Sequence, residues 1–138
     1  MCGILGSIGQ FNTINKDSFH QALLKSNFRG PDYSNSHNFI SCNNQIFLGH
    51  NRLSIIDLNP TGNQPKESHS KNNMIIFNGE IYNHLELRKK FPSDFAWTSN
   101  SDTETLIELI EKFGTIKTLS LIRGMFAFAV YDFKKDII

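Results

Sequence analysis

The chain has 138 residues, of which 39% are hydrophobic and 20% are charged, a composition typical of one soluble globular domain. Its net charge is +1 and its basic residues are scattered, so we expect no nucleic-acid partner. It has no apolar run of membrane-spanning length and no secretory leader, which predicts a cytoplasmic protein with no membrane partner. Two cysteines form neither a disulfide framework nor a zinc ligand set, so no metal site is expected.

The N-terminal segment is predicted to be a strand with a cysteine at its head. Residues 4–9 read Ile-Leu-Gly-Ser-Ile-Gly, a short apolar run typical of a buried strand. Removal of Met1 would place a free α-amine and a thiol on Cys2. An α-amine with a pKa of about 8 can act as general base for the nucleophile of its own residue. Cys2 is therefore a candidate nucleophile, and from this segment alone the alternative is a small buried residue at the start of a strand.

The next elements are predicted to be a helix and a hairpin. A helix begins at Asn15 or Asp17 and stops at Gly30-Pro31. Residues 39–42 and 45–49 flank Asn43-Asn44, whose tolerance of positive φ suits a tight antiparallel turn. Cys42 is interpreted as a small core residue.

The middle of the chain alternates apolar and polar segments. Residues 53–56 continue the apolar pattern, and residues 59–73 form a long polar loop. Residues 74–77 are predicted to be a buried strand that breaks at Asn78-Gly79. A turn and a short helix are expected within residues 80–90.

The last third is predicted to hold two helices and a strand. The stretch Ser101-Asp102-Thr103-Glu104 has the capping-box pattern and starts a helix that ends at Gly114. A short helix follows at 115–121, and residues 125–131 alternate as in a strand packed on both faces, before a turn at 133–136. Strands interleaved with helices indicate an α+β fold with mostly antiparallel sheet.

Five stretches carry unusual polar residues at the ends of predicted strands or at a helix start. They are Met1-Cys2-Gly3-Ile4, Arg29-Gly30-Pro31-Asp32, residues 50–57 (His-Asn-Arg-Leu-Ser-Ile-Ile-Asp), residues 78–83 (Asn-Gly-Glu-Ile-Tyr-Asn) and residues 101–104. In order and approximate spacing, this set resembles the glutaminase domain of glutamine-hydrolysing asparagine synthetases. That domain is a class II glutamine amidotransferase of the N-terminal nucleophile hydrolase superfamily. The resemblance implies that residues 1–138 form a four-layer sandwich, in which two mostly antiparallel sheets lie between helices.

The resemblance also implies a catalytic mechanism. Cys2 would attack the side-chain amide of L-glutamine, form a thioester and release ammonia. Asn78 and Gly79 would donate hydrogen bonds to the oxyanion of the tetrahedral intermediate. Outside this set of motifs, Asn78-Gly79 would be interpreted as a plain turn after a core strand.

The same resemblance assigns the residues that hold the substrate. Arg52 would pair with the glutamine carboxylate and Asp102 with its ammonium, although a surface arginine and an ordinary first-turn acid are the alternatives. The remaining pocket residues would be Leu53, Ser54, Ile55, Ile56 and Glu80. Arg29 and Asp32 are expected to form a structural turn near the site, and His50 and His84 to take no part in the chemistry.

The sequence departs from the family pattern at two places. Phe28 stands where the family usually has histidine. The glutaminase domain of the family continues beyond residue 138 and is followed by a synthetase domain, the expected site of ATP and Mg²⁺. We therefore expect a C-terminally truncated domain, with a synthetase domain or a downstream polypeptide as a candidate partner and with low stability, a tendency to associate and little activity when alone.

The motifs do not name the nitrogen acceptor, and they leave the oligomeric state open. The leading hypothesis is glutamine hydrolysis in the service of asparagine synthesis. The alternatives are an amidotransferase module for another acceptor and a catalytically inactive glutamine-binding fold.

Overall fold

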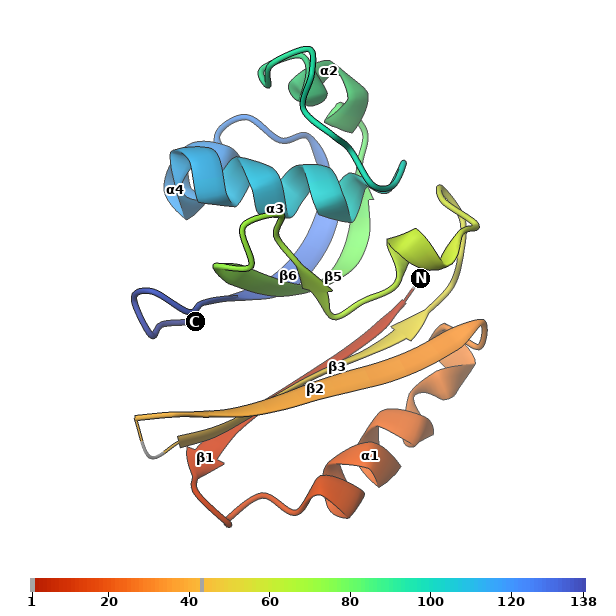
Figure 1. The fold of residues 1–138 in the computed structure, drawn as a ribbon. Helices are drawn as coiled ribbons and strands as arrows, with labels where there is room; N and C mark the ends of the chain where they lie inside the picture. Colours follow the sequence, from red (N-terminus) through yellow and green to blue (C-terminus); the bar gives the residue numbers. More distant parts are fainter. Residues whose placement is uncertain (1, 43) are drawn as a thin grey trace.

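The computed structural model describes residues 2–42 and 44–138, and they form four layers (Figure 1). Helix α1 covers one three-stranded sheet, a second three-stranded sheet lies on the other side of the first, and the remaining helices cover the second sheet. The elements are β1 (Gly3–Gln10), α1 (Lys16–Lys25), β2 (Tyr33–Ser41), β3 (Asn44–Arg52), β4 (Lys66–Glu67), β5 (Asn73–Ile81), α2 (His84–Arg88), α3 (Asp102–Phe113), α4 (Thr115–Leu119) and β6 (Gly124–Asp132). All strand pairs are antiparallel, so the predicted α+β sandwich is confirmed.

The first sheet has the order β1-β3-β2 and packs against α1. Helix α1 starts where predicted, because the Asn15 side chain accepts hydrogen bonds from the backbone N–H groups of the first turn. The helix ends at Lys25, earlier than predicted, and a 3₁₀ turn at Asn27–Arg29 leads to Gly30. Its buried face presents Phe19, whose ring stacks on Phe47 of β3 at a centroid distance of 4.9 Å.

The predicted hairpin is present, but its turn lies one residue earlier than expected. Ser41 pairs with Asn44, so Cys42 belongs to the connection and Asn43 lies outside the described residues. Cys42 has a φ of 45° and is exposed. The prediction of a core role for Cys42 was wrong, because a hairpin tip projects away from both sheets.

Two strands predicted to be fully buried are edge strands with exposed side chains. Ile8 of β1 is 56% exposed and Met125 of β6 is 70% exposed. Each strand lies at an edge of its sheet, where some side chains on one face are left uncovered by the neighbouring layer and face solvent. By contrast, the central strand β3 is buried on both faces over most of its length.

The second sheet has the order β4-β5-β6 and takes part in two cores. One core lies between the sheets and consists of the buried residues Ile46, Leu48, Met74, Ile76 and Tyr131. The other lies between the second sheet and its helices and includes Ile75, Phe77, Leu106, Leu109 and Ile110. Because side chains of a strand alternate between faces, β5 supplies residues to both cores in turn.

Strand β5 continues to Ile81, so the predicted break at Asn78-Gly79 was wrong. Gly79 pairs with Phe126, and a Cβ on Gly79 would lie 2.3 Å from the carbonyl oxygen of Met125. The glycine therefore permits close approach of two strands and does not mark a turn.

Helix α3 begins as the capping box predicts and ends at Gly114. The Ser101 hydroxyl accepts from the N–H of Glu104 at 3.2 Å. The Glu104 carboxylate accepts instead from Thr98 and Ser99, so it fixes the segment before the helix. Gly114 has a φ of 80° and donates its N–H to Ile110, as a helix stop requires.

The free edge of β6 leads to a prediction about association. Along its outer side, the part of the chain that the structure describes supplies one bridge, between Asp132 and Ile137. An apolar edge of this length is a template for intermolecular pairing. We expect the 138-residue chain to form dimers or larger species in size-exclusion chromatography with light scattering, and Ala127→Lys, which places a charge on this edge, to shift it toward monomer. A concentrated sample that stays monomeric would contradict this prediction.

Candidate functional site

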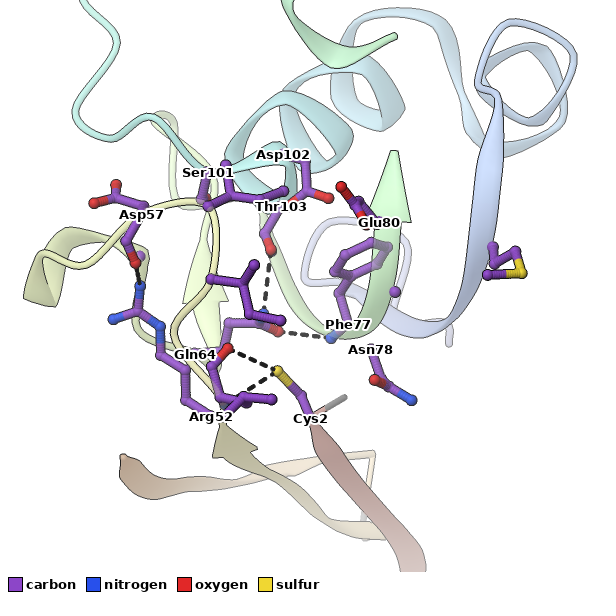
Figure 2. Close-up of a pocket in the computed structure, with 16 residues that line it drawn as sticks. Cys2, Arg52, Asp57, Gln64, Phe77, Asn78, Glu80, Ser101, Asp102 and Thr103 are labelled. Carbon is purple, nitrogen blue, oxygen red and sulfur yellow. Dashed lines mark hydrogen bonds between the residues drawn. The ribbon is translucent and has the colours of Figure 1, made fainter. Parts of the chain in front are cut away.

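A pocket with a cavity volume of about 170 Å³ opens between the two sheets, at the end where β1 begins (Figures 1 and 2). It is lined by Cys2, Arg52, Leu53, Ile55, Ile56, Asp57, Gly62, Gln64, Phe77, Asn78, Gly79, Glu80, Ser101, Asp102, Thr103 and Met125. The structure thus brings together every predicted site residue except Ser54. The N–H of Ser54 donates to Asp32 at 2.7 Å, which places Ser54 behind the pocket wall.

Cys2 lies at the head of β1, and its thiol points into the pocket (Figure 2). The sulfur accepts from the N–H of Leu53 at 3.4 Å and lies 3.7 Å from the carbonyl oxygen of the same residue. Arg29 donates from Nε to the carbonyl oxygen of Cys2 at 3.1 Å. Arg29 and Asp32 therefore support the site from outside, as the sequence predicts. Met1 lies outside the described residues, so removal of the initiator methionine stays a prediction.

The edge of β5 presents a row of backbone donors to the pocket. The N–H of Phe77 donates to Gln64 Oε1 at 2.6 Å and that of Ile81 to Asp102 Oδ2 at 2.9 Å, so both point away from β6. Residues in an antiparallel ladder alternate between pairs that exchange hydrogen bonds and pairs that do not. Gly79 lies midway between these two residues and has the same phase, so its N–H also points away from β6. Its two neighbours in the row have side-chain acceptors, and the Gly79 N–H is left for a ligand.

Asn78 lines the same part of the pocket with an amide that lacks partners. Its Oδ1 atom is buried without a hydrogen bond, and Nδ2 donates to no acceptor within residues 2–42 and 44–138. A buried polar group without a partner costs about 1–3 kcal/mol, so such groups in a pocket indicate ligand binding. Asn78 and Gly79 are adjacent on β5, and both line the pocket.

Arg52 is almost fully buried and is engaged on one side of its guanidinium. Nη1 donates to the Asn59 carbonyl at 2.9 Å and to Asn63 Oδ1 at 2.7 Å, and Nη2 donates to the Asp57 carbonyl. Nε has no acceptor among the residues that the structure describes. Three of the five guanidinium protons therefore hold the loop at 57–63. The proton on Nε and the second proton on Nη2 are left to bind a carboxylate.

Asp102 is the first residue of α3 and is buried at the opposite end of the β5 edge. Oδ2 accepts from the N–H of Ile81 at 2.9 Å. Burial raises the pKa of the Asp102 carboxyl, and the hydrogen bond from Ile81 opposes this rise. A bound ammonium would stabilise the ionised form.

Several pocket residues were not predicted as site residues, and two of them, Gly62 and Gln64, come from the polar loop. Asp57 accepts from the N–H of Asn100 at 2.9 Å, which joins this loop to the segment before α3. Gly62 lets the loop approach Arg52, because a Cβ at this position would lie 2.4 Å from Nη2. Gln64, with an exposed fraction of 5%, spans Phe77 and Thr103. No periodicity marks Gly62 and Gln64, for which the only signal was the length of the loop, whereas Asp57 closes the motif at 50–57.

His50 takes part in the structure more than the sequence predicts. It is fully buried on β3, and its Nε2 lies 3.2 Å from the Phe77 carbonyl oxygen, while Nδ1 has no partner within the described residues. The contact links the two sheets directly behind Asn78. Burial lowers the pKa of His50 to about 4, because a second ring proton would be desolvated and unpaired.

This shift predicts a dependence of stability on pH. Between an unfolded-state pKa of 6.5 and a folded-state pKa of about 4, the unfolded chain binds more protons, so stability falls as pH falls. From pH 7 to pH 4, we expect a loss of about 3 kcal/mol from this residue. Urea denaturation at several pH values should show a flatter profile for His50→Gln than for the unmodified chain. The exposed residue His37 provides the matched control, and equal profiles for His50→Gln and His37→Gln would contradict the prediction.

Two other kinds of site were sought in the described chain. In residues 2–42 and 44–138, no group of three or more His, Cys, Asp or Glu side chains has an arrangement that could hold a metal ion. The helices in the same residues are too short or too polar to cross a bilayer.

Comparison with known proteins places this pocket in a family. The chain is 40% identical to asparagine synthetase B (glutamine-hydrolyzing) of Escherichia coli strain K12, over 78% of the chain and 18% of that protein. It is 35% identical to asparagine synthetase (glutamine-hydrolyzing) of Zea mays, over 96% of the chain and 22% of that protein. It is also 38% identical to the amidase chry2 of Gibberella zeae, over 75% of the chain and 15% of that protein. The chain therefore spans less than a third of the length of these relatives.

A family model described as a glutamine amidotransferase domain matches residues 1–138. The match includes Cys2 at the head of β1, Arg52 at the end of β3 and Asn78 on β5. The chain belongs to the glutamine amidotransferase domain family.

Proposed function

We propose that this chain hydrolyses L-glutamine to L-glutamate and ammonia through a thioester on Cys2. The observation that carries the proposal is the arrangement along the β5 edge: Asn78 and Gly79 lie in one pocket with a thiol, a carboxylate and a partly free guanidinium. Glutamine carries a matching set of groups, namely a side-chain amide, an ammonium and a carboxylate. Each would meet a complementary group.

The chemistry follows from the placement of Cys2. Its sulfur attacks the amide carbon of glutamine, and the carbonyl oxygen becomes an oxyanion held by Asn78 and the Gly79 N–H. The thiol proton passes through the α-amine of Cys2 to the leaving nitrogen, and collapse of the intermediate releases ammonia. Water then attacks the thioester carbon, the bond to sulfur breaks, and glutamate leaves with the thiol restored.

Arg52 and Asp102 would hold the other end of the substrate. The free Nε and Nη2 protons of Arg52 suit a bidentate carboxylate, and Oδ1 of Asp102 suits the ammonium. Glu80, Leu53, Ile55 and Ile56 would complete the walls, and Ser54 would act only through its bond to Asp32. No cofactor is required for this half-reaction.

Replacing Arg52 by lysine is expected to raise KM by at least tenfold with a smaller change in kcat. An ammonium cannot fix the loop at 57–63 through Nη1 and Nη2 and also bind a carboxylate with two donors. Steady-state ammonia release at varied glutamine concentration measures both constants. A KM within twofold of the unmodified value would count against carboxylate binding by Arg52.

The destination of the ammonia is proposed from the relatives. Two of the three named relatives are asparagine synthetases. We therefore propose that the ammonia serves amidation of aspartate in a synthetase domain. That domain would supply the ATP and Mg²⁺ sites. The likeness to an amidase of Gibberella zeae favours a second candidate, an amidotransferase module for another acceptor.

The test measures ammonia release from glutamine by purified protein whose intact mass shows that Cys2 is the first residue. Because the β6 edge is expected to drive association, the assay should include a second form extended at its C-terminus by the segment that follows this domain in the family. Release of ammonia that depends on Cys2 supports the proposal. A well-folded extended form that binds glutamine without turnover would favour the inactive glutamine-binding fold.

A further inference from the structure

Gln64 uses both ends of its side-chain amide inside the pocket wall. Oε1 accepts from the N–H of Phe77 at 2.6 Å, and Nε2 donates to Thr103 Oγ1 at 3.2 Å. Figure 2 shows these two bonds running from one side chain to two different elements, β5 and α3. The side chain is 5% exposed, so neither bond faces competition from bulk water.

The two partners of Gln64 adjoin the two ends of the proposed substrate site. Phe77 directly precedes Asn78 and Gly79, the proposed oxyanion donors, and Thr103 directly follows Asp102, the proposed ammonium acceptor. A single planar amide thus spans the gap between the β5 edge and the start of α3. Together with the hydrogen bond from Ile81 to Asp102 and the packing of α3 on β5, this amide holds the two elements at their spacing.

The Gln64 side chain also takes the place of a backbone hydrogen bond at the point where strand β4 ends. Strand β4 pairs Lys66 with Ile75, and continuation of this register would bring Gln64 opposite Phe77. Pro65 has no N–H to donate, so the backbone pairing ends and the Gln64 side chain takes over at Phe77. The Phe77 carbonyl is held from the other sheet by His50. Both backbone groups of Phe77 are therefore fixed by buried side chains.

We propose that Gln64 is a positioning residue for glutamine hydrolysis, which holds the oxyanion donors of β5 at a fixed distance from the ammonium acceptor on α3. This inference rests on the proposed function. The amide carbon and the α-ammonium of glutamine are joined by a short carbon chain, so both ends bind together only if the two elements keep their spacing. Loss of this spacing by about 1 Å lowers turnover on the order of 10²-fold.

The test is Gln64→Met, which keeps the side-chain length and removes both hydrogen bonds. We expect kcat/KM for glutamine to fall on the order of 10²-fold, with a lower kcat and a higher KM. Alkylation of Cys2 by iodoacetamide should keep its rate, because Cys2 belongs to the other sheet and this small reagent does not use Asn78 or Asp102.

Gln64→Glu should recover part of the lost kcat/KM, because a carboxylate can accept from both the Phe77 N–H and the Thr103 hydroxyl. Gln45→Met, in a half-buried strand position outside the pocket, is the matched control and should retain full activity.

A double-mutant cycle separates positioning from a general loss of stability. Thr103→Val removes only the bond to α3 and should lower kcat/KM less than Gln64→Met does. Because both substitutions break the same link, the double variant should be no worse than Gln64→Met alone. The proposal would be overturned if the double variant lost kcat/KM by the product of the two single losses. It would also be overturned if Gln64→Met kept kcat/KM within twofold of the unmodified protein. If Gln64→Met does not fold, Thr103→Val decides: unchanged kcat and KM would overturn it.

If the proposed glutamine hydrolysis is wrong, the experiments give a result that differs from failure of the Gln64 proposal. The unmodified protein would then release no ammonia, and amide hydrogen exchange becomes the readout for Gln64. Faster exchange at Phe77 and Ile81 in Gln64→Met would support a role in fixing the β5 edge, whereas unchanged exchange would overturn that role as well.

Discussion

Replacement of Cys2 by alanine is expected to reduce ammonia release from glutamine to the background rate. The thiol is the only nucleophile that the described pocket offers next to the Asn78 and Gly79 donors. Without it no thioester forms, and water must attack the amide directly. Glutamine binding should persist in this variant, because Arg52 and Asp102 are unchanged. Calorimetry on Cys2→Ala therefore separates loss of chemistry from loss of the site.

Covalent labelling gives a second measure of the same prediction. Diazo-oxo-norleucine, a glutamine-like electrophile, should label Cys2 and leave Cys42 unmodified. Cys42 lies at an exposed hairpin tip, where a hydrogen bond to the Asp136 carboxylate raises the pKa of its thiol. Cys42→Ala is the control and should keep full activity and full labelling. Peptide mapping that finds both thiols modified equally would contradict a formed active site.

The elements with strong local signals could be predicted from the sequence. The capping pattern at Ser101 fixed the start of α3, and the Asn15 cap fixed the start of α1. Predictions failed where tertiary context decides the outcome. Asn78-Gly79 has the composition of a turn, yet it lies inside a strand because β6 approaches closely at Gly79.

The site was predictable only where residues match a family pattern. The residues assigned to chemistry and to charge pairing, such as Cys2 and Arg52, come together in one pocket. Gln64 carried no comparable signal, because its role depends on hydrogen bonds between segments far apart in the sequence. His50 was interpreted as a bystander, and its contact with Phe77 depends on the packing of one sheet on the other.

The unpaired amide of Asn78 carries the second prediction with a large effect. Asn78→Ala is expected to lower kcat by 10²–10³-fold, about 3–4 kcal/mol in the barrier, because one oxyanion donor is lost. KM should change little, since Arg52 and Asp102, the residues proposed to bind the distant end of glutamine, are unchanged. Steady-state ammonia release measures both constants.

The stability of the same variant distinguishes a ligand-binding role from a structural one. Asn78 Oδ1 is buried without a partner in the described chain, and Nδ2 donates to no acceptor there, so no hydrogen bond within the described residues ties this side chain to the fold. Removal of an unsatisfied polar group is neutral or stabilising. We therefore expect Asn78→Ala to unfold at the same or a slightly higher temperature than the unmodified chain while it loses most of its turnover. A large drop in thermal stability would show that Asn78 is held by the fold and would remove the main reason for assigning it to the oxyanion.

The Asn78→Asp variant tests the donor role of Asn78 more directly, because it keeps the shape of the side chain and removes its N–H donors. A carboxylate next to the developing oxyanion would also repel it, so turnover should fall at least as far as in Asn78→Ala. Cys2 labelling by iodoacetamide should continue in both variants, since that reaction forms no oxyanion. Retention of kcat within tenfold in Asn78→Asp would mean that the Gly79 N–H suffices alone, and the pairing of these two donors would have to be abandoned.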